Sequence, residues 1–584
     1  MKTRAFIGGL MATTLGVASA IGQTAPGITD WGGGFKTGVD PILNTAAKSG
    51  NGQDPTTLAA AQTPMQQKCA GLAAYAAART SATTSRERFA RIPDAPTQVL
   101  KAEVVPAGGG LPEICRVSGV VAPSINFELS LPTSGWNGKF MHYGCGGACG
   151  VVYRPQLEEP LARGYAVIAS DMGHAGAPNS SAYRWANLQA IIDFGYRATH
   201  VVTLAGKEIV DEFYGQVPAK SYYMGCSTGG VQGVIEAQRY PYDFDGILVG
   251  APAYSSGPSY LEWNARANLD TNGDPILTPD KLPMIRKAVL ADCDKLDGLA
   301  DGLIQNPLAC KWDPAKIQCA PGADTAACLT AAQVAVIRKI YTGPTDSRGH
   351  SLSYGPAGMS RGSEWGWTSG FIVPKSNPSQ WLANPDSSYG DGVYPQVGAN
   401  AAHVYDYDKD PQRGDIYFGG AILGWMRYAG NPDLRRFRDN GGKMIMYHGW
   451  DDNEVSPGAS VDYDQLATAT MGGEAATQKF FRLFMMPGMG HCRRGPGGDA
   501  VDYITYLENW VEKGQAPDQV IIHHLAKEQN YLGLPRPRYP LAAGAFDKTR
   551  PAYPFPDVAV YSGKGDPNQA SSWKKAPRAA GAGS

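Results

Sequence analysis

The chain has 584 residues, enough to bury a large hydrophobic core and to form several domains or one domain with long insertions. Its 52 basic and 53 acidic residues give a formal net charge of −1, and Lys and Arg form no dense run, so we expect no nucleic-acid partner. Ten cysteines, an even number, favour the disulfides of an exported protein over the reduced thiols of the cytosol. The oligomeric state does not follow from these numbers.

The N-terminus has the pattern of a secretory signal peptide. Lys2 and Arg4 precede an apolar stretch, residues 5–17, which small residues follow. We therefore predict that residues 1–20 form a cleaved signal peptide, too short to span a bilayer. The expected location is secreted or periplasmic, and we expect no membrane partner.

Apolar strand-like runs alternate with helical periodicity in the rest of the chain. The expected strands are Phe127–Leu131, Lys139–Tyr143, Tyr165–Ser170, Ser221–Met224, Phe244–Val249, Lys443–Tyr447 and Phe480–Met485. The expected helices are Gly195–Tyr214, Gly229–Tyr240 and Val501–Lys513. This alternation predicts an α/β fold with a mostly parallel sheet covered on both faces.

The alternation stops in the middle of the chain. Residues 254–432 are rich in Gly, Pro, Asn, Asp and aromatic residues, which favours an inserted domain of loops and short elements. We therefore predict a catalytic domain made of residues 21–253 and 433–584. The inserted domain, residues 254–432, is expected to form a lid.

A candidate nucleophile lies between one expected strand and the helix after it. Residues 225–229 read Gly-Cys-Ser-Thr-Gly, the G-x-S-x-G pattern of a nucleophile elbow. Gly225 and Gly229 allow the sharp turn that exposes the oxygen of Ser227 above the sheet. The alternative is a chance match in a glycine-rich chain.

A serine nucleophile needs a base, and the base needs a carboxylate that fixes its orientation. The strand expected to end at Tyr447 leads into a loop with Asp451 and Asp452, and His491 follows the next strand. The order Ser, Asp, His is typical of an α/β-hydrolase fold. We favour Asp452 as the acid, with Asp451 as a helix-capping or surface alternative.

A serine nucleophile that attacks a carbonyl group also needs donors for the oxyanion of the tetrahedral intermediate. The backbone N–H of Thr228, the residue after the candidate nucleophile, is one expected donor. The glycine-rich loop at residues 144–150 follows an early strand, and Gly147 is the second candidate. The alternative for this loop is a flexible surface turn.

Local spacing suggests four disulfides: Cys69 with Cys115, Cys145 with Cys149, Cys293 with Cys310, and Cys319 with Cys328. Cys226 and Cys492 remain, although the sequence permits other pairings. If these two pair, their Cα atoms lie roughly 5 to 6 Å apart, and the neighbouring Ser227 and His491 come close together. Zinc binding is disfavoured because no spacing of two cysteines and two histidines occurs.

These motifs resemble the tannase and feruloyl esterase family, over a stretch from about Cys69 to about Gln519. The resemblance rests on residues 136–139, 225–227, 439–442, 447–452 and 487–492. It implies a triad of Ser227, Asp452 and His491, a Cys226–Cys492 bridge, and hydrolysis of esters of phenolic acids such as ferulate or gallate. A terephthalate monoester is the alternative substrate, which Thr228 disfavours because the family's terephthalate-monoester hydrolase has a glutamate there.

The same resemblance implies a structural Ca²⁺ site in the insertion. The loop at residues 293–303 contains three carboxylates punctuated by glycines, and such hard oxygen ligands suit Ca²⁺. The implied ligands are the side chains of Asp294, Asp297 and Asp301 and the carbonyls of Leu299 and Leu303. Without the resemblance, aspartate-glycine pairs more often simply form turns.

The expected protein is thus a secreted serine esterase whose insertion contacts an aromatic acyl group. Aromatic residues of the insertion can stack on such a group or form the insertion's own core: Trp263, Trp365, Trp367, Phe371, Trp381, Tyr389, Tyr394 and Trp425. A non-catalytic binding protein on a hydrolase scaffold is the alternative from a different class, and it leaves three filled triad positions without a use.

Overall fold

The computed structural model describes residues 62–73, 84–147, 149–176, 188–252, 257–352, 358–369, 371–373, 408, 429–526 and 537–577. The expected signal peptide lies outside the described residues, as do Trp381, Tyr389, Tyr394 and Trp425. Among the residues described, none of the helices has the length and apolar character needed to cross a membrane.

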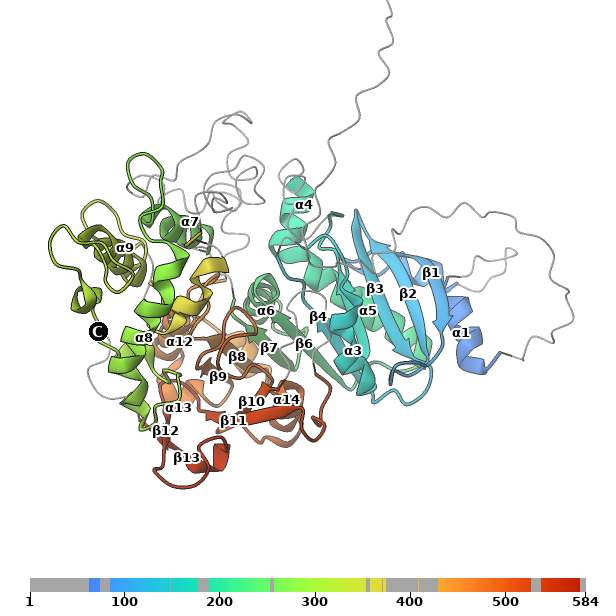
Figure 1. The fold of residues 1–584 in the computed structure, drawn as a ribbon. Helices are drawn as coiled ribbons and strands as arrows, with labels where there is room; N and C mark the ends of the chain where they lie inside the picture. The colour runs from blue at the N-terminus through green and yellow to red at the C-terminus, as the bar shows by residue number, and fades with distance from the viewer. Residues whose placement is uncertain are drawn as a thin grey trace, which may run out of the picture. The chain divides into compact units, whose positions relative to one another are not determined.

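A nine-stranded sheet runs through the protein in the order β1-β2-β3-β5-β4-β6-β7-β8-β9 (Figure 1). In that order the strands are Thr97–Val105, Ile114–Val121, Ile125–Pro132, Ala166–Ser170, Lys139–Tyr143, Lys220–Cys226, Gly246–Gly250, Lys443–Gly449 and Phe481–Met486. The expected strands all appear within a residue or a few of their predicted bounds. β1 and β2 were not predicted.

Six neighbouring strands, β5, β4, β6, β7, β8 and β9, are parallel to one another. The pairs β1–β2, β2–β3 and β3–β5 are antiparallel. The prediction of a mostly parallel sheet is therefore confirmed. Because parallel strands end at one edge of a sheet, the loops after β6, β8 and β9 gather there.

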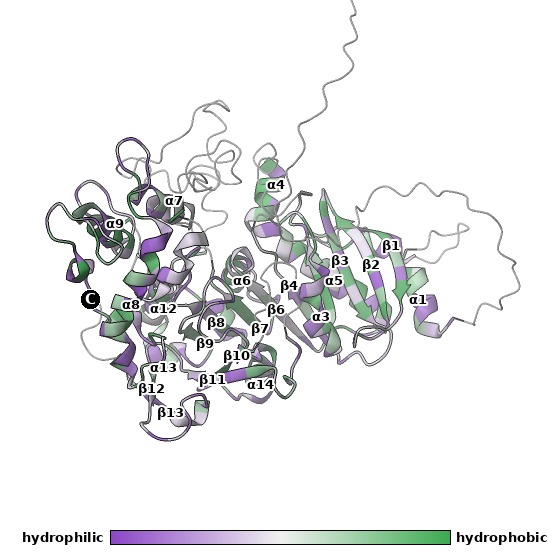
Figure 2. Cartoon of the chain, in the orientation of Figure 1, coloured by the Kyte–Doolittle hydropathy of each residue, from purple (hydrophilic) through white to green (hydrophobic). Residues whose placement is uncertain are grey.

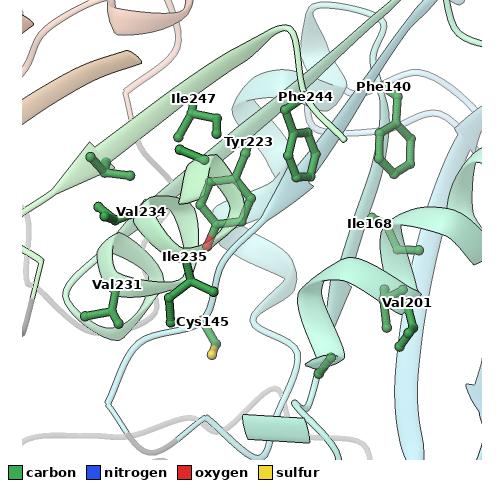
Figure 3. Close-up of a cluster of buried hydrophobic side chains, with 14 of the residues drawn as sticks. Phe140, Cys145, Ile168, Val201, Tyr223, Val231, Val234, Ile235, Phe244 and Ile247 are labelled. Atoms are coloured by element: carbon green, nitrogen blue, oxygen red, sulfur yellow. The ribbon is translucent and has the colours of Figure 1, made fainter. Parts of the chain in front are cut away.

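Side chains alternate between the two faces of the sheet, and helices cover both. Tyr223 of β6 packs in one buried cluster with α5 (Ala198–Tyr214) and α6 (Thr228–Arg239). Figure 3 shows Tyr223 in this cluster together with Val234 and Ile235 of α6. The next residue on either side, Tyr222 or Met224, belongs to the opposite cluster, with α3 (Arg154–Ala162) and α14 (Tyr503–Lys513).

The segment between β7 and β8 has a hydrophobic core of its own. This core joins α7 (Gly257–Ala267), α8 (Leu282–Cys293) and α9 (Ala331–Thr342). Trp367 and Phe371 are buried in it, so these two aromatic residues serve packing. A separate core suits an inserted domain, and the exact limits at residues 254 and 432 stay a prediction.

The C-terminal part forms two small antiparallel sheets, β10 (Val520–Leu525) with β11 (Phe546–Ala552) and β12 (Val558–Tyr561) with β13 (Trp573–Ala576). Figure 2 shows β11 in hydrophilic colours, unlike the hydrophobic β7 in the middle of the large sheet.

The other helices are α1 (Pro64–Leu72), α2 (Ser85–Phe89), α4 (Leu188–Ile192), α11 (Arg435–Asp439), α12 (Pro457–Met471) and α13 (Glu474–Thr477). Short 3₁₀ and π segments complete the described elements: η2 (Asp193–Arg197), η3 (Pro279–Lys281), η4 (Asp294–Asp297), η5 (Pro307–Ala309), η6 (Pro314–Ile317), η7 (Ser363–Ser369) and η10 (Ala570–Ser572).

Candidate active site

Ser227 occupies the turn between β6 and α6. Its backbone has φ 61° and ψ −120°, a conformation that residues other than glycine rarely adopt. Its N–H donates to the carbonyl of Gly250 at 2.9 Å. A Cβ at Gly225 would lie 2.5 Å from the oxygen of Gly229, and one at Gly229 would lie 2.9 Å from the oxygen of Cys145. Glycine is therefore required at both positions for this strained turn.

Asp452 and His491 form a buried hydrogen-bonded pair at the same edge of the sheet. The Nδ1–H of His491 donates to Oδ2 of Asp452 at 2.7 Å. Oδ1 of Asp452 accepts the backbone N–H groups of Glu454 at 2.9 Å and Val455 at 2.8 Å. Burial opposes ionisation, but the charge of His491 and its hydrogen bond hold the pKa of Asp452 well below its usual range.

Asp451, the alternative acid, faces a different partner. Its Oδ2 accepts the indole N–H of Trp365 at 2.7 Å, and burial raises its pKa to about 7. Trp365 belongs to η7 of the insertion, and the side-chain amide of Asn453 donates to the carbonyl of Gly366 at 2.9 Å. Asp452, rather than Asp451, therefore holds His491, and the loop around both aspartates is bound to the insertion.

His448 is a residue of the site that the sequence analysis did not single out. Its Nε2 lies 3.1 Å from Oδ2 of Asp452, and its Nδ1 lies 2.8 Å from the hydroxyl of Ser460. With a proton on Nε2, the ring donates to Asp452 and its Nδ1 accepts from the hydroxyl of Ser460, which fixes its orientation. The spacing of four residues between His448 and Asp452 was the available signal.

The pKa of His491 is raised by two carboxylates. Burial alone would lower it, but the charges of Asp452 and Glu454 and the hydrogen bond to Asp452 raise the pKa of His491 to about 9. Oε2 of Glu454 lies 3.9 Å from Nε2 of His491, on the ring nitrogen that Asp452 does not use. Glu454 also escaped the sequence analysis.

A disulfide joins the Ser227 turn to the His491 loop. Cys226 and Cys492 are bonded with their Cα atoms 6.1 Å apart, although 266 positions separate them in sequence. Each is the immediate neighbour of a candidate triad residue. The other pairs are those suggested by local spacing: Cys69–Cys115, Cys145–Cys149, Cys293–Cys310 and Cys319–Cys328.

The glycine-rich loop after β4 lies against the first turn of α6. The hydroxyl of Thr228 donates to the carbonyl of Gly147 at 2.7 Å, and Gly147 has φ +58°. The Cys145–Cys149 bridge closes the loop, and the side-chain amide of Gln232 in α6 donates to the sulfur of Cys145 at 2.9 Å. The two expected oxyanion residues are therefore neighbours.

The acidic loop after α8 is curled by hydrogen bonds between its aspartates and its own backbone. Asp294 accepts the N–H groups of Asp301 at 3.2 Å and Gly302 at 3.0 Å. Asp297 accepts that of Leu299 at 2.9 Å, and Asp301 accepts that of Leu303 at 3.2 Å. The three carboxylates and both leucines named by the sequence thus share one compact turn.

Asp297 shows that this loop suits a cation. Its Oδ2 is buried without a hydrogen-bond donor, and burial, together with the charges of Asp301 and Asp294, raises its pKa to about 7. A cation bound there would supply the missing partner, and carboxylate and carbonyl oxygens are the ligands that Ca²⁺ prefers. Asp301 already has one cationic neighbour, because Arg550 of β11 donates to it at 2.6 Å.

The parallel sheet, the strained turn at Ser227 and the Asp452–His491 pair at the same edge are features of the α/β-hydrolase fold. The profile of the tannase and feruloyl esterase family matches residues 109–576, and the chain belongs to that family. It is therefore a carboxylic ester hydrolase.

Curated relatives and solved structures agree with this assignment. The chain is 34% identical over 528 residues to the mono(2-hydroxyethyl) terephthalate hydrolase of Piscinibacter sakaiensis, covering 79% of this chain and 84% of the relative. It is 31% identical over 457 residues to a probable feruloyl esterase B-2 of Aspergillus flavus, covering 72% and 82%. The crystal structure of feruloyl esterase B from Aspergillus oryzae superposes with a TM-score of 0.71 at 25% identity, covering 88% of this chain and 100% of that one.

We predict that the Cys226–Cys492 bridge stabilises the fold more than a short bridge does. By the chain-entropy relation, closing 266 residues contributes on the order of 5 kcal/mol, against about 2.5 kcal/mol for the nine-residue Cys319–Cys328 separation. Guanidinium unfolding of a Cys226→Ser, Cys492→Ser variant should show the larger loss. A Cys319→Ser, Cys328→Ser variant is the matched control, and equal losses in the two variants would contradict the prediction.

Proposed function

We propose that this esterase acts through an acyl-enzyme formed on Ser227. The serine oxygen attacks the ester carbonyl while Nε2 of His491 accepts its proton, and Asp452 holds the imidazole and stabilises its cation. His491 then gives the proton to the departing alcohol. Water attacks the acyl-serine with His491 again as the base, which releases the acid and restores the serine.

The 2.7 Å contact between His491 and Asp452, in a loop tethered by a disulfide to the residue beside Ser227, carries this proposal. That contact leaves Nε2 as the nitrogen available for proton transfer. The N–H of Thr228 at the start of α6 and that of Gly147 are the proposed oxyanion donors. The hydrogen bond between these two residues supports the pairing.

We propose esters of aromatic acids, such as ferulate or gallate, as the substrates. Feruloyl esterase B from Aspergillus oryzae and the feruloyl esterases among the curated relatives support a phenolic acyl group. The terephthalate-monoester hydrolase, at 34% identity, supports a terephthalate monoester as the second candidate. In both cases the insertion is the proposed lid, and its Trp365–Asp451 hydrogen bond beside the triad loop supports that role.

We also propose that the protein is exported, to the periplasm or beyond the cell, and that it binds one structural Ca²⁺. The five disulfides and the N-terminal signal pattern support export. The proposed Ca²⁺ ligands are the side chains of Asp294, Asp297 and Asp301 and the carbonyls of Leu299 and Leu303. The buried, unpartnered oxygen of Asp297 supports the site.

Replacement of the proposed nucleophile is the direct test of the mechanism. We expect Ser227→Ala to lower kcat on methyl ferulate by about 10⁴-fold or more, because no acyl-enzyme can form. Ser571→Ala, at an exposed position, is the matched control and should keep full activity. Substantial turnover by a folded Ser227→Ala protein would falsify the proposed mechanism, and inactive wild-type protein on every ester would favour a binding role.

The raised pKa of His491 predicts an alkaline enzyme. The base must be neutral to accept a proton, so its activity is lost as pH falls below a pKa of about 9. We expect kcat/KM to rise roughly tenfold per pH unit below that value and to level off above it. The methyl ester of 4-methoxycinnamic acid is the suitable substrate, because it has no phenol to titrate. Ser227→Ala corrects for hydrolysis by hydroxide, and a plateau already reached at neutral pH would contradict the prediction.

Chelation should test the calcium proposal without an activity assay. We expect removal of Ca²⁺ to lower the Tm by roughly 3 to 5 °C, because the ion binds the folded state, and added Ca²⁺ to restore it. Asp297→Asn removes one ligand charge, so its Tm should not respond to chelator. Purified protein that contains no calcium by elemental analysis, and whose Tm is unchanged by chelator, would refute the site.

A further inference from the structure

Glu454 is an acidic residue of the site that the proposed mechanism does not use. It follows Asp452 by two positions in the loop after β8, and its side chain is 47% exposed, whereas that of His491 is 5% exposed. Its Oε2 lies 3.9 Å from Nε2 of His491. A solvent-accessible carboxylate therefore stands beside the nitrogen that exchanges protons during the reaction.

The position of Nε2 identifies which part of an ester Glu454 meets. Nδ1 of His491 is occupied by Asp452, so Nε2 must protonate the departing alcohol. A proton donor lies about 3 Å from its acceptor, which places the alcohol oxygen within roughly 7 Å of the Glu454 carboxylate. Glu454 thus lies within electrostatic reach of the alcohol side of the ester.

The charged groups around Glu454 are His491, Asp452 and the guanidinium of Arg494. Asp452, from the same loop, is also an anion, and its oxygens accept hydrogen bonds from His491 and from two backbone N–H groups. Arg494, from the loop after β9, is the cation whose charge opposes that of Glu454, and its side chain is exposed to screening solvent. Partial burial and the charge of Asp452 raise the pKa of Glu454 above its usual range, although the charges of His491 and Arg494 act in the opposite direction.

We propose that Glu454 determines specificity for the alcohol half of the ester: it disfavours alcohols that carry an anion near the scissile bond and favours hydroxyl-rich or cationic ones. The proposal rests on the mechanism through Ser227 and His491. A carboxylate accepts hydrogen bonds from neutral hydroxyls, as on a sugar or glycerol, and attracts a cation. Between unit charges roughly 7 Å apart in a partly solvated site, the effect on kcat/KM is about tenfold.

Ferulate esters of glycolic acid, glycerol and choline test the proposal, because they share one acid and differ in the charge of the alcohol. We expect Glu454→Gln to raise the ratio of kcat/KM for the glycolate ester to that for the glycerol ester by about tenfold. The same variant should lower the ratio of kcat/KM for the choline ester to that for the glycerol ester. Such ratios cancel the fraction of folded enzyme in each preparation. Arg494→Gln should shift them in the opposite direction.

Glu103→Gln is the matched control, since it removes the same charge from β1, at the far edge of the sheet from β8 and β9. It should leave every ratio unchanged. A second readout is the acid limb of the glycerol ester, which Glu454→Gln should move to lower pH because one of the carboxylates facing His491 is gone.

The outcomes separate the two proposals. Unchanged ratios in a Glu454→Gln enzyme that hydrolyses all three esters would overturn the role of Glu454 alone. Failure of the wild-type enzyme on all three, or full activity of Ser227→Ala, would overturn the proposed function and this inference with it.

Discussion

The bond between Cys226 and Cys492 is the constraint on which the geometry of the site depends. It connects a turn after the sixth strand to a loop after the ninth, so that two segments from distant parts of the chain share one short covalent path. The strained backbone of Ser227 needs such support, because its positive φ is held against a steric cost. Glycines at positions 225 and 229 lower that cost by allowing the helix and strand to approach each other.

Electrostatics complete what the covalent framework begins. The buried carboxylate of Asp452 is held by two histidines and two backbone N–H groups, which allows a full charge where solvent is absent. His448 shares this carboxylate with His491, so the acid is oriented from two sides. Asp451, one position earlier, accepts a hydrogen bond from Trp365 of the insertion, so the same short loop links the Asp452–His491 pair to the insertion.

Residues that belong to a local motif or a periodic pattern could be predicted from the sequence. Residues that loops bring together from distant positions could not. The elbow at 225–229 and the strands of the parallel sheet have periodic or positional signals, and these matched the structure. The antiparallel strands β1 and β2 lie before the stretch in which alternation with helices made strands recognisable. Glu454 could not be identified from the sequence, because its approach to His491, 37 positions away, is one that no spacing rule describes. The choice between Asp451 and Asp452 likewise depends on which carboxylate faces the imidazole.

The ion pair between Arg550 and Asp301 implies an order in which parts of this chain can complete their folding. Its guanidinium reaches Asp301 across 249 positions, and the backbone of Gly298 in the same acidic loop lies against Tyr561. The inserted domain is synthesised long before β11. During translation, the acidic loop therefore cannot form its ion pair with Arg550 until the C-terminal segment has emerged. In a chain that ends before residue 546, Asp301 has no ion pair with Arg550, and the insertion loses this contact with the C-terminal strands.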